Sequence, residues 1–151
     1  MPAGFFEISH SPILQFSNSI LVISSAMIRT ELFVRLGNSP GALEGVCRLL
    51  ANERVNILAL MLESTGQLRL IVDNHTHAAA ILREHHHTVT ERDVIVTSLP
   101  NEPGALASVL RFVTDANVNI EYAYCGVPGG AMAAVVLGVD DAMRAAAAAG
   151  L

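Results

Sequence analysis

The chain has 151 residues, a formal net charge of −5 and 52% hydrophobic residues, and all nine of its basic residues are arginine. An acidic chain with scattered arginines lacks the basic face of a nucleic-acid-binding protein. The absence of lysine excludes a Schiff-base lysine and a phosphate-loop lysine. The two cysteines, Cys47 and Cys125, form no C-x-x-C pair. Neither a disulfide framework nor a zinc site is therefore indicated, and we expect a reduced, cytoplasmic setting.

The first 28 residues differ from the rest, because they contain neither lysine nor arginine. A signal peptide begins with a positively charged region, and a membrane span needs about 20 apolar residues, so this segment fits neither. We expect residues 1–28 to be an extension outside the folded modules, with no membrane contact. Met27, just before the first module, is an alternative start of translation.

The remainder of the chain repeats itself. Residues 38–62 align without a gap on residues 101–125, an offset of 63 positions (101 − 38), and ten of the 25 aligned residues are identical. The shared positions include the N-x-P-G-A-L segments, which start at Asn38 and Asn101, and a V-N-I segment farther on. Such self-similarity indicates a duplicated unit. The sequence therefore predicts two modules, over residues 29–91 and 92–151.

Each module has the same order of predicted elements. Alternating apolar residues predict a strand over 32–36, and apolar residues spaced i, i+3, i+4, i+7 predict a helix directly after N-x-P-G. The first module continues with predicted strands over 55–63 and 68–73, a helix over 75–85 and a strand from about 88. The second module has predicted strands near 92–98, 118–125 and 131–139 and a helix over 140–149.

This β-α-β-β-α-β order predicts an α+β fold of two ferredoxin-like modules in tandem, each with its helices on one sheet face. The second module lacks its last strand, because the chain stops at Leu151. The stretch 88–99 is too short for two full strands and a loop. We expect one bent strand there, or two abutting ones, to join the modules. Two modules of about 60 residues are marginal alone, so they should pack on each other or on a second chain.

In both copies a strand, N-x-P-G-A-L, an amphipathic helix and V-N-I follow one another. This order resembles the ACT domain, a regulatory amino-acid-binding module, over residues 29–150. The chain is similar to small stand-alone tandem ACT proteins that have no attached enzyme. The resemblance implies that the loop asparagine and the V-N-I asparagine contact an amino acid, Asn38 with Asn56 and Asn101 with Asn119.

The N-x-P-G loop also has the chemistry of an anion site, besides its plain role as the turn that starts a helix. A helix N-terminus presents unpaired N–H groups and about half a positive charge, which suits a ligand carboxylate. In each copy the two asparagines are 18 residues apart (56 − 38 and 119 − 101), and we expect them to converge on one ligand between modules. The predicted ligand-binding residues are Asn38, Ser39, Pro40, Gly41, Ala42, Leu43, Asn56, Ile57, Asn101, Glu102, Pro103, Gly104, Ala105, Leu106, Asn119 and Ile120.

The two loops differ in one charge, because Ser39 of the first is replaced by Glu102 in the second. A carboxylate beside a helix N-terminus competes with a ligand carboxylate, and like charges repel. We expect the first loop to hold the acid group of the ligand and Glu102 to lie near an ammonium group.

Other motifs have simpler explanations. Residues 37–41 spell G-x-S-x-G, but Pro40 lacks the N–H that a nucleophile elbow uses for its oxyanion hole. Five histidines lie between His75 and His87, and we expect a solvated helix end there rather than a metal site. Tyr122 and Tyr124 share one strand face and should anchor a core or interface with their hydroxyls on a polar partner. Asp73, Asp140 and Asp141 are expected to cap helices.

The sequence thus predicts a non-catalytic regulator or sensor that binds an amino acid and is a homodimer. Its mechanism would be a population shift between two packings of its modules. The alternative is a regulatory subunit that docks on a separate biosynthetic enzyme. No cofactor, metal or nucleic acid is expected.

Overall fold

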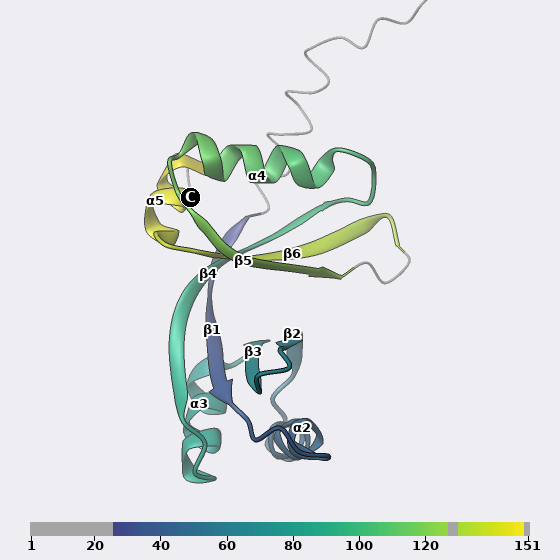
Figure 1. Ribbon diagram of the computed structural model, residues 1–151, viewed down its shortest axis with the longest axis vertical. Helices are drawn as coiled ribbons and strands as arrows, with labels where there is room; N and C mark the ends of the chain where they lie inside the picture. Colours follow the sequence, from purple (N-terminus) through teal and green to yellow (C-terminus); the bar gives the residue numbers. More distant parts are fainter. Residues whose placement is uncertain (1–25, 127–129, 150–151) are drawn as a thin grey trace, which may run out of the picture.

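Figure 1 shows the computed structural model, which describes residues 26–126 and 130–149. Of the extension predicted over residues 1–28, all but the last three residues lie outside the described part. The strands are β1 (Met27–Arg35), β2 (Ile57–Leu62), β3 (Gln67–Val72), β4 (Val89–Pro100), β5 (Ile120–Gly126) and β6 (Met132–Val139). The helices are α2 (Ala42–Asn52), α3 (His75–Glu84), α4 (Ala105–Asp115) and α5 (Ala142–Ala149). Every predicted element is present.

The six strands form one antiparallel sheet in the order β2-β3-β1-β4-β6-β5. The first module consists of β2-β3-β1-β4, which is the ferredoxin-like strand order. The second module has the same order when it is counted as β5-β6-β4-β1. The prediction of two tandem ferredoxin-like modules is therefore confirmed, and the two modules share their central strands.

The first residues of β1 take the place of the strand that the second module lacks. β1 pairs with β4 along its whole length, from Val34 opposite Val89 to Met27 opposite Val96. Among the described residues the strands of the second module are β4, β5 and β6, and β1 completes their sheet. Met27 and Ile28, which the sequence places in the extension, belong to this shared strand. The junction between the modules is a single 12-residue strand, β4, as expected.

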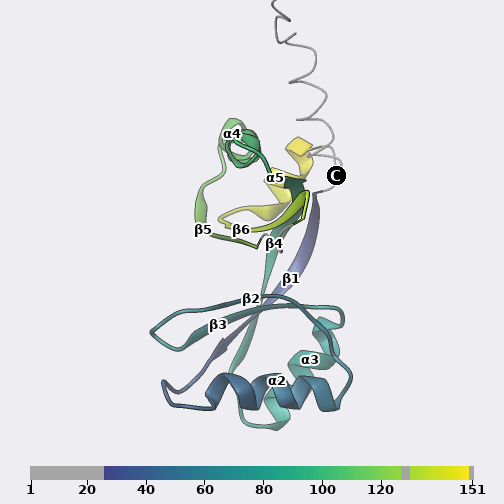
Figure 2. The same cartoon turned by 90° about the vertical axis from the view of Figure 1, so that its right-hand side faces the viewer.

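The helices lie on the outer sides of the two modules. Figures 1 and 2 show α2 and α3 covering one half of the sheet, and α4 and α5 covering the other half. All four helices lie on the same face of the twisted sheet, since Val89 of the first core and Ile95 of the second are on the same side of β4. The helix-free faces of the two halves are turned toward each other on either side of the twisted β1–β4 ribbon.

Three groups of buried side chains follow from this arrangement. One lies between the first half-sheet and α2 and α3, around Leu32 and Leu50, and another lies under α4 and α5, around Val113 and Leu137. A third, smaller group lies between the helix-free faces and contains Ile71, Val94 and Val136. The modules therefore pack on each other, as their small size requires. Within the described ranges no helix is both long and apolar enough to cross a membrane.

Candidate functional site

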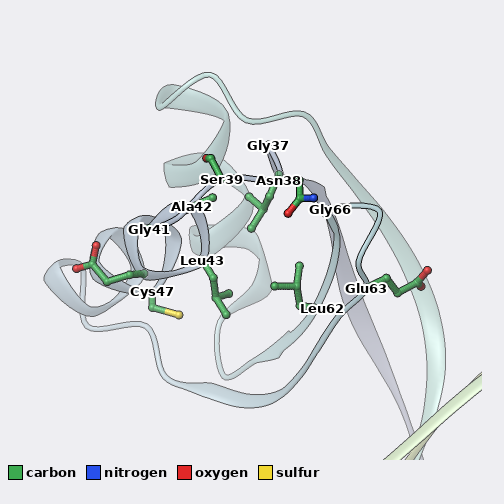
Figure 3. A pocket seen from close by; sticks show the side chains of 12 residues that line it. Gly37, Asn38, Ser39, Gly41, Ala42, Leu43, Cys47, Leu62, Glu63 and Gly66 are labelled. Atoms are coloured by element: carbon green, nitrogen blue, oxygen red, sulfur yellow. The ribbon is translucent and has the colours of Figure 1, made fainter.

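A pocket of about 470 Å³ opens where the β1–α2 loop, the start of α2 and the β2–β3 hairpin meet. Figure 3 shows Leu43, Leu62 and Cys47 facing the same space, with the 37–41 loop along one side. The volume lies within the range of small-molecule sites. The residues that line it are Leu36, Gly37, Asn38, Ser39, Gly41, Ala42, Leu43, Glu44, Cys47, Leu62, Glu63 and Gly66.

The start of α2 lies at this pocket, and two of its backbone N–H groups, those of Leu43 and Glu44, have no backbone acceptor among the described residues, whereas Ala42 N donates to the Ser39 carbonyl at 3.2 Å. Its N-cap residue is Gly41, with φ of 83°, and no side chain caps it. By contrast, α3 is capped by Asn74, whose Oδ1 accepts from the backbone N of His77 at 3.1 Å. In α5, Asp141 Oδ1 accepts from the backbone N of Arg144 at 2.8 Å. Helices that follow N-x-P-G are thus left uncapped, since α4 also starts at a glycine, Gly104, without a side-chain cap.

The two loop asparagines are engaged differently. Asn38 lines the pocket, and its side chain forms no hydrogen bond within residues 26–126 and 130–149. Asn101, its counterpart, donates from Nδ2 to the carbonyl of Gly130 at 3.4 Å, and its backbone N donates to Ala131 at 2.9 Å. The second loop is therefore bound to the β5–β6 hairpin of its own module, whereas the amide of Asn38 is available to a ligand.

The two asparagines of a pair do not converge within one module, so that expectation is wrong. Asn38 precedes α2 and Asn56 follows it, and a helix of 11 residues is about 16 Å long. Asn56 does not line the pocket, which is reached by the other end of β2, at Leu62. A β-α-β crossover returns the chain along the helix, so the second strand starts at the end opposite the first loop.

The V-N-I asparagines have a structural role that both copies repeat. The backbone N of Asn56 donates to Asp73 Oδ1 at 3.0 Å, and the backbone N of Asp73 donates to the Asn56 carbonyl at 3.1 Å. Asn119 and Asp140 make the same two bonds at 3.0 and 3.1 Å. The carboxylates of Asp73 and Asp140 therefore bind the residues just before β2 and β5 and do not cap the helices that follow them. Of the three aspartates predicted to cap a helix, Asp141 does so.

The predicted site residues fall into three groups. Five of them line the pocket: Asn38, Ser39, Gly41, Ala42 and Leu43. Three others of the first module do not: Pro40, Asn56 and Ile57. The predicted site residues of the second module lie at two places. The exposed loop 101–104 and the first two residues of α4 (Ala105 and Leu106) lie at one end of this helix, and Asn119 and Ile120 lie beyond its other end, where β5 begins.

The sequence did not predict the part of the pocket that comes from Glu44 and Cys47 of α2 and from the β2–β3 hairpin. Leu62, Glu63 and Gly66 belong to the hairpin formed by the two predicted strands over 55–63 and 68–73, whose contact with the loop was not predicted. The backbone N of Leu36 donates to the Gly66 carbonyl at 2.7 Å. A Cβ at Gly66 would overlap the carbonyl of Leu36, so only glycine fits there. The sequence signal for this turn is the segment Ser64-Thr65-Gly66 between the two strands, since a glycine after polar residues is typical of a turn.

The histidines are spread along α3 and its end. His77 Nε2 lies 3.7 Å from Glu53, and His85 Nδ1 lies 2.9 Å from the Ile81 carbonyl. Among the described residues no three histidine, cysteine or acidic side chains gather as a metal site would require.

The tyrosines have the polar partner that was predicted, and it is Glu31. The hydroxyls of Tyr122 and Tyr124 donate to the Glu31 carboxylate at 2.5 and 2.8 Å. Burial raises the pKa of both tyrosines well above the usual value, and the hydrogen bonds to Glu31 raise these pKa values further. Glu31 was not singled out from the sequence, because a lone acid in a strand normally faces solvent.

A sequence model described as ACT domain pair matches residues 27–148 of this chain. The match starts at the first residue of β1 and includes both modules. No curated protein matches the chain.

Solved structures with the same fold include protein BT0572 from Bacteroides thetaiotaomicron, at 35% sequence identity and a TM-score of 0.75, over 82% of this chain and 88% of that one. The ligand-free regulatory subunit of aspartate kinase from Thermus thermophilus is 16% identical, with a TM-score of 0.61 over 83% of this chain and 94% of that one. The corresponding subunit from Thermus flavus is 16% identical, with a TM-score of 0.59 over 85% and 97%.

Proposed function

The chain belongs to the ACT domain pair family, and we propose that it is a non-catalytic regulator that binds an amino acid in the pocket at the start of α2. ACT domains are regulatory modules, and similar structures include regulatory subunits of aspartate kinases. One observation carries the proposal for this pocket: an uncapped helix N-terminus and an unbonded amide, that of Asn38, face the same cavity.

The lining of the pocket suits an amino acid with its carboxylate at the first loop. The free N–H groups at the start of α2 and the Asn38 amide would bind the carboxylate. Leu36, Leu43 and Leu62 form an apolar wall for a side chain. Gly41 keeps the loop in its left-handed conformation and leaves open space where another residue would carry a Cβ.

We further propose that the working form is a homodimer paired through β2. This strand is one edge of the sheet, and it exposes Leu58, Leu60 and Leu62 by 48, 38 and 43%. An unpaired edge that carries exposed apolar side chains is suited to strand addition. Antiparallel pairing of two β2 strands would place the start of one strand beside the end of the other. Asn56 of the second copy would then reach the pocket that contains Asn38.

The second loop has a lesser role in this proposal. Glu102 is exposed at the position of Ser39, and Asn101 is already bonded to the β5–β6 hairpin. A ligand carboxylate would meet repulsion at Glu102 and would have to displace a hydrogen bond. The second loop would contact an ammonium group of a ligand instead.

A regulatory subunit that docks on a biosynthetic enzyme remains the alternative. The similarity to regulatory subunits of aspartate kinases favours it, although at 16% identity that similarity shows only the fold. Purification of the tagged chain from its own cells, with and without added amino acids, separates the two. Co-purification of one enzyme in a fixed ratio would support the subunit role.

The test of the binding site is a thermal-shift screen of the twenty standard amino acids, followed by titration calorimetry. An amino acid at about 100 times its Kd should stabilise the fold by about 2.7 kcal/mol, which raises Tm by about 5–10 °C. Asn38→Ala removes a hydrogen bond to a charged group and should weaken binding by about 10- to 150-fold. Asn101→Ala is the matched control and should change the affinity much less. The proposal fails if no amino acid raises Tm or if Asn38→Ala binds the hit unchanged.

A further inference from the structure

A buried ionic cluster joins the two modules on their helix-free faces. Glu31 of β1 is fully buried and accepts hydrogen bonds from Tyr122 and Tyr124 of β5. Arg69 of β3 lies beside it, with Nη1 3.4 Å from Glu31 Oε2. The guanidinium carbon of Arg69 is 3.8 Å from the centre of the Tyr122 ring. We call these four residues the Glu31 cluster. Through it, two strands of the first module hold the edge strand of the second.

The cluster is held firmly on the side of the second module. A Cβ at Gly138 would overlap the Tyr122 ring, so this ring packs directly on the backbone of β6. A buried carboxylate is costly unless hydrogen bonds and an opposite charge compensate it. Any movement of Arg69 therefore changes how strongly Glu31 holds the two tyrosines.

The pocket at the start of α2 reaches the same cluster through the end of β2. Figure 3 shows Leu62 directed into the pocket and Glu63, the next residue, directed away from it. The Glu63 carboxylate lies 3.7 Å from Arg69 Nε. One short segment of chain thus contacts both the occupant of the pocket and Arg69.

Arg69 contacts two carboxylates through different nitrogens, and its Nη1 donates a long hydrogen bond of 3.4 Å to Glu31 Oε2. Its Nε is buried and has no hydrogen-bond partner among the described residues. Strong N–H···O bonds are about 2.7–3.2 Å long. The distances of 3.7 Å to Glu63 and 3.4 Å to Glu31 are both longer than this. A displacement of about half an ångström would bring the Glu63 carboxylate within hydrogen-bond distance of Arg69 Nε.

We propose that occupancy of the α2 pocket is transmitted to the second module through Glu63, Arg69 and Glu31. An occupant that displaces Leu62 brings Glu63 toward Arg69 Nε. Arg69 then moves away from Glu31, whose charge is compensated more by the tyrosine hydroxyls, and β5 is held in a second position. The inference rests on the proposed function for the nature of the natural occupant. The link between pocket and cluster is tested without that occupant.

Tyrosine emission provides the readout, because the chain has no tryptophan and both of its tyrosines belong to the cluster. A carboxylate that accepts a hydrogen bond from a tyrosine hydroxyl quenches the emission of that tyrosine. The pocket can be filled covalently, since Cys47 lines it. The experiment uses the full chain with Cys125→Ser, alkylates Cys47 with iodoacetamide and confirms the stoichiometry by mass. The Cys47→Met variant, whose side chain is longer than that of cysteine, fills the pocket in a second way without alkylation.

Filling the pocket should lower tyrosine emission relative to the unfilled protein, with the unfolded chain as the unquenched reference. Glu63→Gln should abolish this decrease. Glu44→Gln is the matched control, because Glu44 also lines the pocket but pairs with Arg48, at 3.4 Å, outside the cluster. Emission that is unchanged or increased in both the alkylated and the Cys47→Met protein, or an equal decrease in Glu63→Gln, overturns the proposal.

The same protein separates this inference from the proposed function. If none of the twenty amino acids raises Tm but alkylation lowers the emission, the amino-acid site is wrong and the link stands. If an amino acid raises Tm through Asn38 but leaves the emission unchanged, the site stands and the link is overturned.

Discussion

The two N-x-P-G loops have nearly the same backbone but different surroundings. Gly41 and Gly104 have φ of 83° and 88°, and neither of the helices that follow has a side-chain cap. Beside the first loop lies the short 63–66 turn, and the side chain of Asn38 makes no bond within the described residues. Beside the second lies a longer hairpin that accepts a hydrogen bond from Asn101.

This comparison shows that the element packed against a loop decides what the loop can bind. Duplication copied the helix start and the asparagine, which are local features. The two hairpins diverged. The side chain of Asn38 is therefore available to a ligand, whereas the side chain of Asn101 donates to the hairpin of its own module. Substitutions in the two hairpins, at the helix caps and in the two loops test this contrast.

Gly66→Ala should have the largest effect, because the new Cβ would overlap the Leu36 carbonyl at a residue with φ of 81°. Overpacking costs about 1–3 kcal/mol, and positive φ adds about 1 kcal/mol for a residue other than glycine. We expect a loss of about 3 kcal/mol, which lowers Tm by about 6–12 °C. Gly130→Ala, in the second hairpin, is the control, because a Cβ there meets nothing within 4 Å. Equal melting temperatures for the two variants would contradict the tight contact of the first hairpin.

Asn74→Ala should have an intermediate effect that does not depend on ligand. It removes the side-chain cap of α3 and should cost about 1 kcal/mol, or about 2–4 °C in Tm. The start of α2 has no such cap, so a bound amino acid should supply one. The ligand-induced rise in Tm should therefore be the same in Asn74→Ala and in the unaltered chain. A smaller rise in the variant would mean that the ligand binds at α3.

Glu102→Ser should have the smallest effect. It makes the second loop match the first and removes an exposed charge beside the start of α4. Charges at helix ends contribute about 0.3–1 kcal/mol, so the affinity should change by about two- to fivefold, or a second binding site should appear in the stoichiometry. Calorimetry of the variant against Ser39→Glu, the reverse change in the first loop, measures both. If affinity and stoichiometry are unchanged in both variants, the charge difference between the two loops does not cause their asymmetry.

Much of the candidate site was predictable because its chemistry is local. N-x-P-G specifies a turn and a helix start, and the absence of a capping side chain follows from the glycine at the N-cap. Asn38, Ser39 and Gly41 were therefore identified from the sequence alone. Leu62 and Glu63 were not, because their position beside the loop depends on how β2 and β3 pair.

The sequence by itself determined the repeat, the order of the elements and the fold class. Apolar periods of two and 3.6 residues and turn residues act over a few positions, so they can be read without tertiary contacts. The structure alone decided that β1 completes the second module and that Glu31 is buried against two tyrosines. Each of these depends on pairing between residues that are distant along the chain, and no local pattern encodes it.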